Sequence, residues 1–287
     1  MTVTIERQAY QVEQGTLSAL TAGALDGEQI ILLHGMPASA ELFRGVIPIL
    51  AEAGYRVIAP DMAGYGHTRM ADSTDYSLSA SADLFAKWIE AEGLNPVWLI
   101  GHDLGGGVAQ MMAVRYPHLI AHLSIGNTLV ADSFPVFAVN MAIMIAKTGL
   151  FPTLASLGLI PNPYMSWEVR KGFGDTSKLT PEMMKRVFWD GKASDPQGRR
   201  KFAQHLKHLR NDESVAIAGQ LKDIPMPTQL LWAEQDRHQP IDTIGKRLHD
   251  LLPDGTPFDR MPNAGHFVPA EAPQLYAETL LNWRRGV

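Results

Sequence analysis

Two acidic residues and a histidine stand at places in this chain where an apolar, strand-like run has just ended. Asp103 follows the run Val97–Ile100 and precedes a segment with helical spacing, while Asp236 and His266 follow two later runs. A carboxylate is ionised at neutral pH and can displace a leaving group from saturated carbon. A histidine oriented by a second acid is a general base. These residue types predict a nucleophile, a base and an orienting acid.

Small residues surround Asp103 on both sides. Gly101, Gly105 and Gly106 stand where a strand gives way to a helix, within a G-x-D-x-G frame. A strand–turn–helix with glycines around its tip is a nucleophile elbow, whose turn is too tight for larger neighbouring side chains. The tip is usually serine, and here it is Asp103. We expect Asp103 to be strained and exposed at the tip of this turn.

With this frame the chain resembles the α/β-hydrolase family, and in particular its aspartate-nucleophile branch, the epoxide hydrolases and haloalkane dehalogenases. The run His34–Pro37 matches the H-G-x-P signature of this family, and a D-x-x-G-x-G turn begins at Asp61. The chain order nucleophile, acid, histidine is also that of the fold. The resemblance implies an α/β-hydrolase fold, with a mostly parallel eight-stranded sheet flanked by helices and an inserted helical cap.

The resemblance and the chemistry together assign a role to each site residue. Asp103 attacks, His266 acts as the base, and Asp236 holds the histidine tautomer and stabilises the imidazolium. Water activated by His266 then hydrolyses the ester, and the N–H groups of Met36 and Leu104 hold the oxyanion. This mechanism requires no metal and no organic cofactor.

The orienting acid has alternatives. Glu234 lies two residues before Asp236 and is the second candidate, and Asp132 is the third. Some relatives take this acid from the end of the preceding strand, where this chain has Asn127, which carries no charge. We expect His34, beside the oxyanion loop, to have a structural role.

The leaving group is less clearly indicated than the nucleophile. Haloalkane dehalogenases that resemble this chain hold halide with a tryptophan directly after the nucleophile, and often with an asparagine after the His-Gly pair. Those positions are Leu104 and Met36 here, whose side chains donate no hydrogen bond. Trp167 and Trp189 in the inserted segment are the remaining candidate donors.

Epoxide hydrolases instead protonate the opening oxygen with two cap donors, usually two tyrosines or a tyrosine and a histidine. The inserted segment offers Tyr164 together with His205 or His208. We therefore predict a hydrolase that forms a covalent alkyl ester on Asp103, with a small apolar epoxide favoured over an alkyl halide. An ester or lactone hydrolase and a non-catalytic receptor for a small ligand stay open, because the fold alone does not decide function.

Strand and helix patterns alternate along most of the chain, which is typical of a parallel sheet with right-handed crossovers. We expect strands over 3–12, 16–24, 29–33, 55–59, 97–100, 120–126, 228–232 and 256–261, and helices over 43–53, 79–92, 108–113, 241–251 and 273–285. The alternation stops between about Asp132 and Asp223, where prolines separate helical segments. The predicted domains are a core of 1–131 and 224–287 and a helical cap of 132–223.

Composition narrows the possible partners. With 287 residues, of which 46% are hydrophobic, the chain can bury a sizeable core. A net charge of −5 without a basic run gives no reason to expect nucleic acid or an anionic membrane, so a small neutral apolar substrate is expected. The absence of cysteine excludes disulfides, thiol catalysis and thiolate metal sites.

Two segments bear on location and assembly. The run Met1–Arg7 alternates like a strand and lacks the layout of a signal peptide, so we expect a cytoplasmic protein. The apolar run Val136–Met144 is too short to cross a bilayer and is interrupted by Asn140. It predicts a helix that packs on the main domain or contributes to a dimer, so the protein is expected to be a monomer or a weak homodimer.

Overall fold

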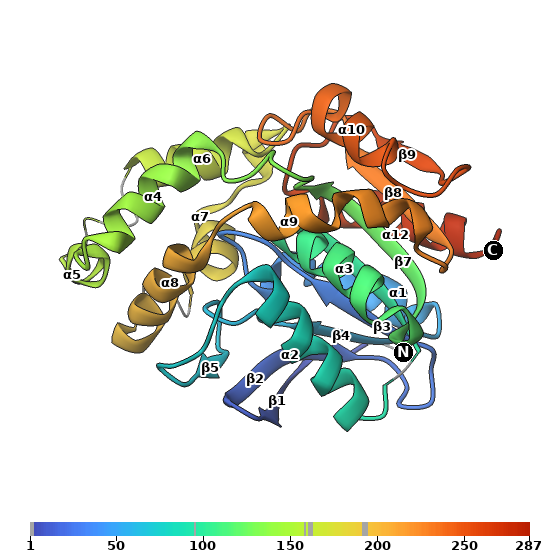
Figure 1. Ribbon diagram of the computed structural model, residues 1–287, viewed down its shortest axis with the longest axis horizontal. Coiled ribbons are helices and arrows are strands. Elements are labelled where there is room, and N and C mark those ends of the chain that lie inside the picture. Colours follow the sequence, from blue (N-terminus) through green and yellow to red (C-terminus); the bar gives the residue numbers. More distant parts are fainter. Residues whose placement is uncertain (1–2, 95, 158, 160–162, 191–194) are drawn as a thin grey trace.

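A twisted sheet with helices on both faces forms the centre of the protein (Figure 1). This computed structural model describes residues 3–94, 96–157, 159, 163–190 and 195–287. The strands are β1 (Glu6–Val12), β2 (Gly15–Ala22), β3 (Gln29–Leu33), β4 (Arg56–Pro60), β5 (Arg69–Met70), β6 (Val97–Asp103), β7 (Ile120–Thr128), β8 (Thr228–Ala233) and β9 (Phe258–Met261).

The strand order is β1-β2-β4-β3-β6-β7-β8-β9, with β5 paired to β2. The pairs of β2 with β1, β4 and β5 are antiparallel, and the pairs from β4 onward are parallel. The mostly parallel sheet of eight strands is confirmed, and the two-residue β5 is added to it. A strand of two residues is too short to show a periodic pattern, and it pairs only with Gly15 and Thr16 at the start of β2.

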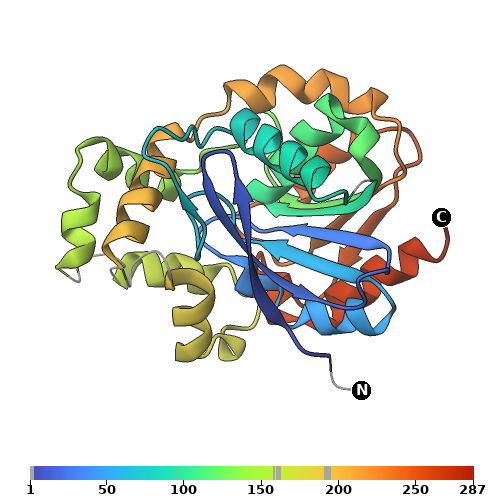
Figure 2. The same cartoon turned by 90° about the horizontal axis from the view of Figure 1, so that it is seen from below.

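Core helices cover both faces of the sheet. They are α1 (Val46–Glu52), α2 (Leu78–Ala91), α3 (Leu104–Arg115), α10 (Lys246–His249), α11 (Val268–Glu271) and α12 (Pro273–Arg284), with the short turns η1 (Ala40–Phe43), η2 (Pro117–Leu119) and η6 (Ile241–Gly245). In Figure 2, α2 and α3 lie on one face, and α1 and α12 lie on the other. The predicted helices 43–53 and 241–251 are each split, because a short turn precedes the α-helical part.

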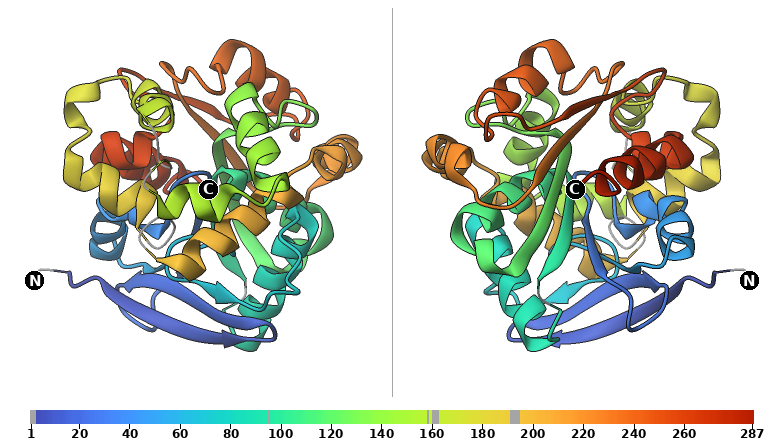
Figure 3. Two further views of the ribbon diagram at one scale, coloured as in Figure 1. Left: turned by 90° about the vertical axis from the view of Figure 1, so that its left-hand side faces the viewer. Right: turned by 90° about the vertical axis from the view of Figure 1, so that its right-hand side faces the viewer.

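The segment between β7 and β8 contains helices and no strand among its described residues. The helices are α4 (Phe137–Lys147), α5 (Phe151–Ser156), α6 (Pro163–Lys171), α7 (Pro181–Met183), α8 (Pro196–His208) and α9 (Asp212–Ile217), with η3 (Thr176–Lys178), η4 (Met184–Trp189) and η5 (Ala218–Asp223). Figures 1 and 3 show α4 to α8 at one end of the molecule. By contrast α9 and η5 pack on the core helix α3, although the predicted cap includes them. None of the helices formed by the described residues has the length and apolar character needed to span a bilayer.

The buried Asp61 carboxylate hydrogen-bonds residues from the edge strand β1 and from two loops that follow β3 and β4. Asp61, the first residue of the D-x-x-G-x-G turn, is 0% exposed. It accepts hydrogen bonds from Arg7 at 2.7 Å and from the backbone N–H groups of Ala40 and His67 at 2.8 and 2.9 Å. Burial by itself raises the pKa of Asp61, yet these partners hold it below the usual value. Gly66 completes the turn, because a Cβ there would overlap the Asp61 carboxylate.

We expect Asp61→Asn to lower the free energy of unfolding by about 1–3 kcal/mol, because the new amide N–H₂ leaves at least one buried donor unpaired. Urea unfolding followed by circular dichroism measures this change. The matched control is Glu13→Gln, since the ion pair of Glu13 with Lys87 is exposed and its loss leaves stability nearly unchanged. Equal stability of the two variants would contradict the structural role of Asp61.

Candidate active site

Asp103 lies at the turn between β6 and α3, where the backbone is strained. Its φ of 53° and ψ of −122° lie in a region that residues other than glycine rarely adopt. The hydroxyl of Thr128 donates a 2.6 Å hydrogen bond to the Asp103 carbonyl and holds the turn. The predicted strain is therefore present. The predicted exposure is wrong, since Asp103 is only 6% exposed beneath the cap helices.

Glycines allow the chain to pack closely against this turn. A Cβ on Gly35 would overlap the Asp103 side chain, and a Cβ on Gly105 would overlap the backbone of Leu33 and His34. His34 fixes the same loop, because its Nδ1 bonds the Gly35 carbonyl at 3.0 Å and its Nε2 accepts the Met62 N–H at 2.9 Å. The loop after β3 thereby lies directly against the Asp103 carboxylate.

Three donors surround the Asp103 carboxylate. The N–H of Met36 donates to Oδ2 at 2.7 Å, and the side-chain amide of Gln239 donates to Oδ1 at 3.0 Å. The Leu104 N–H also hydrogen-bonds this carboxylate. Burial raises the pKa of Asp103 to about 6, against the lowering effect of His266 and the two backbone N–H groups. Asp103 is therefore mostly ionised at neutral pH, and the backbone donors lie where an oxyanion can be held.

His266 is buried beside two carboxylates. Its Nδ1 hydrogen-bonds Asp236 Oδ2 at 2.8 Å, which leaves Nε2 as the acid–base atom. Burial lowers the pKa of His266, but the Asp236 and Asp103 carboxylates outweigh burial and raise it. The ring of His102, directly before Asp103, bonds the His266 carbonyl at 2.7 Å and fixes its backbone.

Asp236 is held by several donors at once. Its Oδ1 accepts the N–H groups of His238 and Gln239, both at 2.8 Å, and its Oδ2 accepts the Asn127 amide at 2.7 Å. Burial raises the pKa of Asp236, but His266 and these donors bring it below the usual value. The uncharged Asn127 therefore orients the acid rather than replacing it.

The two other candidate acids lie away from His266. Glu234 has an exposed side chain on the loop after β8. Asp132 is exposed and forms an ion pair with Arg247 at 2.5 Å. The structure thus brings Asp236 to His266, and it does not bring Glu234 or Asp132 there.

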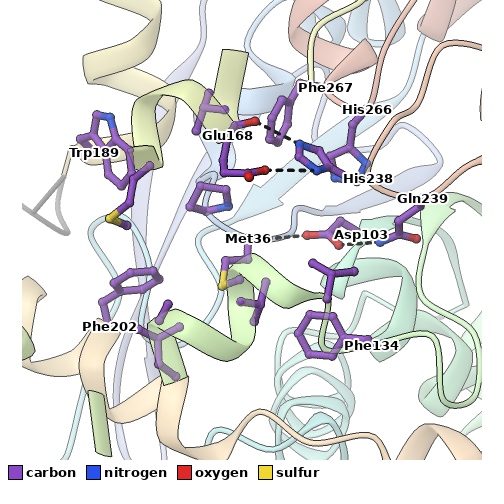
Figure 4. A pocket seen from close by; sticks show the side chains of 17 residues that line it. Met36, Asp103, Phe134, Glu168, Trp189, Phe202, His238, Gln239, His266 and Phe267 are labelled. Carbon is purple, nitrogen blue, oxygen red and sulfur yellow. Dashed lines mark hydrogen bonds and ion pairs between the residues drawn. The ribbon is translucent and has the colours of Figure 1, made fainter. Parts of the chain in front are cut away.

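A cavity of about 130 Å³ opens above Asp103 (Figure 4). Most of its walls are apolar, and they come from the loop after β3, from α4, α6 and α8, and from Phe267 directly after His266. The polar residues that line it are Asp103, Glu168, Trp189, His238, Gln239 and His266. Such walls suit an uncharged substrate without many polar groups.

His205 and His208, expected as cap donors, are not among the residues that line this cavity. The face of α8 that carries Phe202 and Leu206 faces the cavity, whereas the His205 ring packs against Tyr65 with 4.7 Å between ring centroids. Burial lowers the pKa of His205 to about 3, so it is not charged at neutral pH. His208 accepts the Tyr76 N–H at 2.8 Å, and its ring also lies against the Tyr76 ring. Both expectations are wrong, because the rotation of α8 is set by how the cap packs on the core.

Of the predicted aromatic cap residues, Trp189 lines the cavity and Trp167 does not. Trp167 is 53% exposed, lies against Lys171 and does not line the cavity. Trp189 does line it, but its ring nitrogen is buried, hydrogen-bonds no other described residue, and points away from Asp103 in Figure 4. The backbone of Tyr164 belongs to α6, and its side chain lies outside the described part of the chain. Of the two tryptophans, Trp189 alone lines the cavity.

Comparison with known proteins agrees with this geometry. Residues 29–273 match the family described as alpha/beta hydrolase fold. The chain belongs to this family. YugF of Bacillus subtilis, named an uncharacterized hydrolase, is 26% identical over 267 residues, which cover 89% of this chain and 89% of YugF.

Two further relatives carry names of the expected branch. A haloalkane dehalogenase of Mycobacterium marinum is 27% identical over 278 residues, which cover 91% of this chain and 86% of that protein. The structure of the epoxide hydrolase CorEH without ligand has a TM-score of 0.80 and 22% identity, covering 99% of this chain and 99% of that chain. The latter likeness shows the fold. The resemblance to hydrolases of the epoxide hydrolase and haloalkane dehalogenase type is confirmed.

Three polar residues of this hydrolase site were missed from the sequence. Gln239 bonds Asp103, and His238 and Glu168 contact each other at the cavity wall (Figure 4). His238 Nε2 bonds the Glu168 carbonyl at 3.1 Å, and its Nδ1 lies 3.9 Å from Glu168 Oε2. Burial and the nearby His266 lower the pKa of His238 to about 4. The position of His238 and Gln239, directly after the predicted acid Asp236, could have identified them as site residues. Nothing in the sequence pattern of α6 distinguishes Glu168 from the other polar residues of that helix.

The described residues contain no cluster of three or more His, Asp or Glu that could hold a metal ion.

We expect the pKa of His266 to lie above its usual 6.5 in the intact protein, and to fall in Asp103→Asn, because one of the two carboxylates that stabilise the imidazolium is lost. Histidine NMR titration measures both values. Asp132→Asn is the matched control and should leave the His266 pKa unchanged, since Asp132 is paired with Arg247. A His266 pKa below 6.5 in the intact protein, or one insensitive to Asp103→Asn, would contradict the proximity of the two groups.

Proposed function

We propose that this protein hydrolyses a small, neutral, apolar substrate through a covalent alkyl ester on Asp103. The observation that carries the proposal is the Asp103 carboxylate, which is held at a strained turn between backbone donors at the floor of an apolar cavity. His266, paired with Asp236, supplies a base beside it. A carboxylate nucleophile suits attack on saturated carbon better than attack on a carbonyl, which disfavours an ordinary esterase.

The first step uses the two carboxylate oxygens differently. Oδ2 stays on the Met36 N–H, so Oδ1, oriented by the Gln239 amide, is the oxygen that attacks. The substrate carbon forms a bond with Oδ1 and loses its bond to the leaving group. The product is an ester whose remaining carboxyl oxygen already lies in the oxyanion hole.

Ester formation itself prepares the second step. Asp103 loses its charge when it is alkylated, and one of the two anions that raise the pKa of His266 disappears. His266 becomes a better proton acceptor at neutral pH, and its Nε2 takes a proton from water that attacks the Asp103 carboxyl carbon. The Cγ–O bond to the product breaks, and the product oxygen takes the proton from His266. The Asp103 carboxyl group, which now holds the water oxygen, loses its remaining proton to the solvent, and the carboxylate is restored.

For the leaving group we propose an epoxide oxygen. An alkoxide leaves poorly unless it is protonated, and the cavity wall holds the Glu168 carboxyl 3.9 Å from both His238 Nδ1 and Lys171 Nζ. A lysine ammonium is an N–H donor, so this cluster can deliver a proton through the Glu168 carboxyl to the opening oxygen. Halide departure needs N–H donors instead, and the indole nitrogen of Trp189 points away from Asp103.

A haloalkane is the second candidate substrate. The haloalkane dehalogenase of Mycobacterium marinum, whose similarity covers 91% of this chain, supports it. The same Asp103 and His266 chemistry would serve either substrate, and the difference lies in the groups that receive the leaving atom.

Replacing His266 with Gln should separate the two steps, because an ionised carboxylate attacks without the help of a base while ester hydrolysis needs one. Incubation with styrene oxide should give an adduct on Asp103 with the mass of the whole epoxide, seen by intact-mass spectrometry and peptide mapping. Hydrolysis of this ester should be about 10²–10⁴-fold slower than in the intact enzyme. The control is the double variant with Asp103→Asn, which should form no adduct. A folded His266→Gln protein that neither alkylates nor turns over, beside an active parent, would argue against this division of roles.

Glu168→Gln should distinguish the leaving groups. Styrene oxide hydrolysis should fall about 10²-fold or more, because the carboxyl group that passes the proton from Lys171 to the opening oxygen is lost. Release of bromide, which takes no proton, should be unaffected. Glu182→Gln, at an exposed cap position, is the matched control. The variant Tyr164→Phe tests the expected tyrosine donor.

The enzyme would be assigned to haloalkanes if it released bromide faster than it formed diol. In that case bromide release should be insensitive to Glu168→Gln and lost in Trp189→Phe. Ligand binding without turnover of either class would favour a receptor.

A further inference from the structure

Helix α4 is apolar on two faces. Val139 and Ala142 line the cavity above Asp103. On the other face, Phe137, Met141 and Met144 follow the i, i+4, i+7 spacing and are 76%, 41% and 62% exposed. A helix that is apolar all round is normally covered on all sides. The outer face of α4 is therefore a candidate surface for a partner.

The exposed apolar surface extends past the end of α4. Leu150 and Leu157, at the two ends of α5, are 54% and 68% exposed. Helices α4 and α5 form the outermost end of the molecule on the cap side (Figures 1 and 2). Seven of the ten exposed large hydrophobic side chains among the described residues lie between positions 137 and 167. We call the surface made by the following five residues the outer cap face: Phe137, Met141, Met144, Leu150 and Leu157.

Charge is divided unevenly between this end and the rest of the protein. Residues 132–223 contain 13 Lys and Arg against 9 Asp and Glu, a net charge of +4, so the remaining residues carry −9 of the total of −5. The expectation of no membrane partner was based on the net charge of −5 for the whole chain, which does not show that the inserted segment is basic. No Asp or Glu occurs between residues 133 and 167, and the charged residue there is Lys147 at the end of α4. Lys207 is exposed on α8, which packs against α4 and α5.

We propose that the outer cap face docks onto an anionic lipid surface. Its apolar side chains enter the boundary between headgroups and acyl chains, and Lys147 and its basic neighbours attract the lipid phosphates. A second copy of this chain is the less favourable occupant, because joining two outer cap faces would bring together two caps of charge +4. The acidic core, on the far side from the cap, turns toward the solution in this orientation (Figure 1).

This docking places α4 between the lipid and the cavity. Its inner residues Val139 and Ala142 line the cavity together with Val136 directly before the helix, and its outer face lies on the lipid. If the proposed function holds, an apolar substrate dissolved in the lipid reaches the cavity along α4. The docking itself does not depend on that function, and lipid binding is measured separately from hydrolysis.

The test is co-sedimentation of the full chain with vesicles of phosphatidylcholine and phosphatidylserine in a three-to-one ratio, compared with pure phosphatidylcholine. The chain should bind the anionic vesicles, and the binding should weaken at high salt. The double variant Phe137→Ser with Met144→Ser should lose at least tenfold in apparent vesicle affinity. The matched control is Leu25→Ser, because Leu25 is 75% exposed on the core and lies outside the outer cap face. Its binding should equal that of the parent.

A second variant keeps the test independent of any folding defect. Lys147→Glu changes one exposed charge and should also reduce binding to anionic vesicles. No binding of the parent chain to anionic vesicles, or equal binding by the parent and the double serine variant, would overturn the proposal. A dimer in light scattering that the double variant dissociates, without vesicle binding, would assign the face to a second copy instead.

Discussion

The close contact between the loop after β3 and the turn at Asp103 is the constraint on which the site depends. A Cβ on Gly35 would overlap the Asp103 carboxylate, and a Cβ on Gly105 would overlap the backbone of Leu33 and His34 from the other side of the contact. The contact brings the Met36 N–H to 2.7 Å from Asp103 Oδ2. It is maintained by sheet pairing, since β3 and β6 are neighbouring parallel strands that end at the same edge. The strain at Asp103 is the cost of presenting a carboxylate to this loop.

Around this contact the electrostatics are set by burial and by two carboxylates that share one histidine. Asp236 has several hydrogen-bond donors and stays ionised, whereas burial brings the pKa of Asp103 to about 6. The pKa values of the two carboxyl groups therefore differ, although both groups lie beside the His266 ring. This difference suits Asp236 for orienting His266 and Asp103 for the proposed attack. In the proposed mechanism, alkylation of Asp103 lowers the proton affinity of His266 by removing one of these two charges.

The sheet strands and the turn at Asp103 could be predicted from local patterns. An apolar run such as Gln29–Leu33 and the glycines around Asp103 determine the structure of only a few neighbouring residues, so the signal is contained in the sequence itself. The side-chain directions in the cap could not be predicted in this way. His205 and Phe202 lie on one helix, and only the packing of α8 on the core decides which faces the cavity. Gln239 and Glu168 were missed because a lone polar residue has no periodic signal, and its role depends on a partner distant in sequence.

The central claim is that Asp103 forms a covalent ester, and isotope labelling tests it most directly. The enzyme in excess would convert styrene oxide once in water enriched in ¹⁸O. The account predicts that the diol carries the unlabelled oxygen of Asp103, and that after repeated turnover the label accumulates in the peptide that contains Asp103. Label found in the diol after one turnover, with none in that peptide, would contradict it, because water would then have attacked the substrate carbon itself.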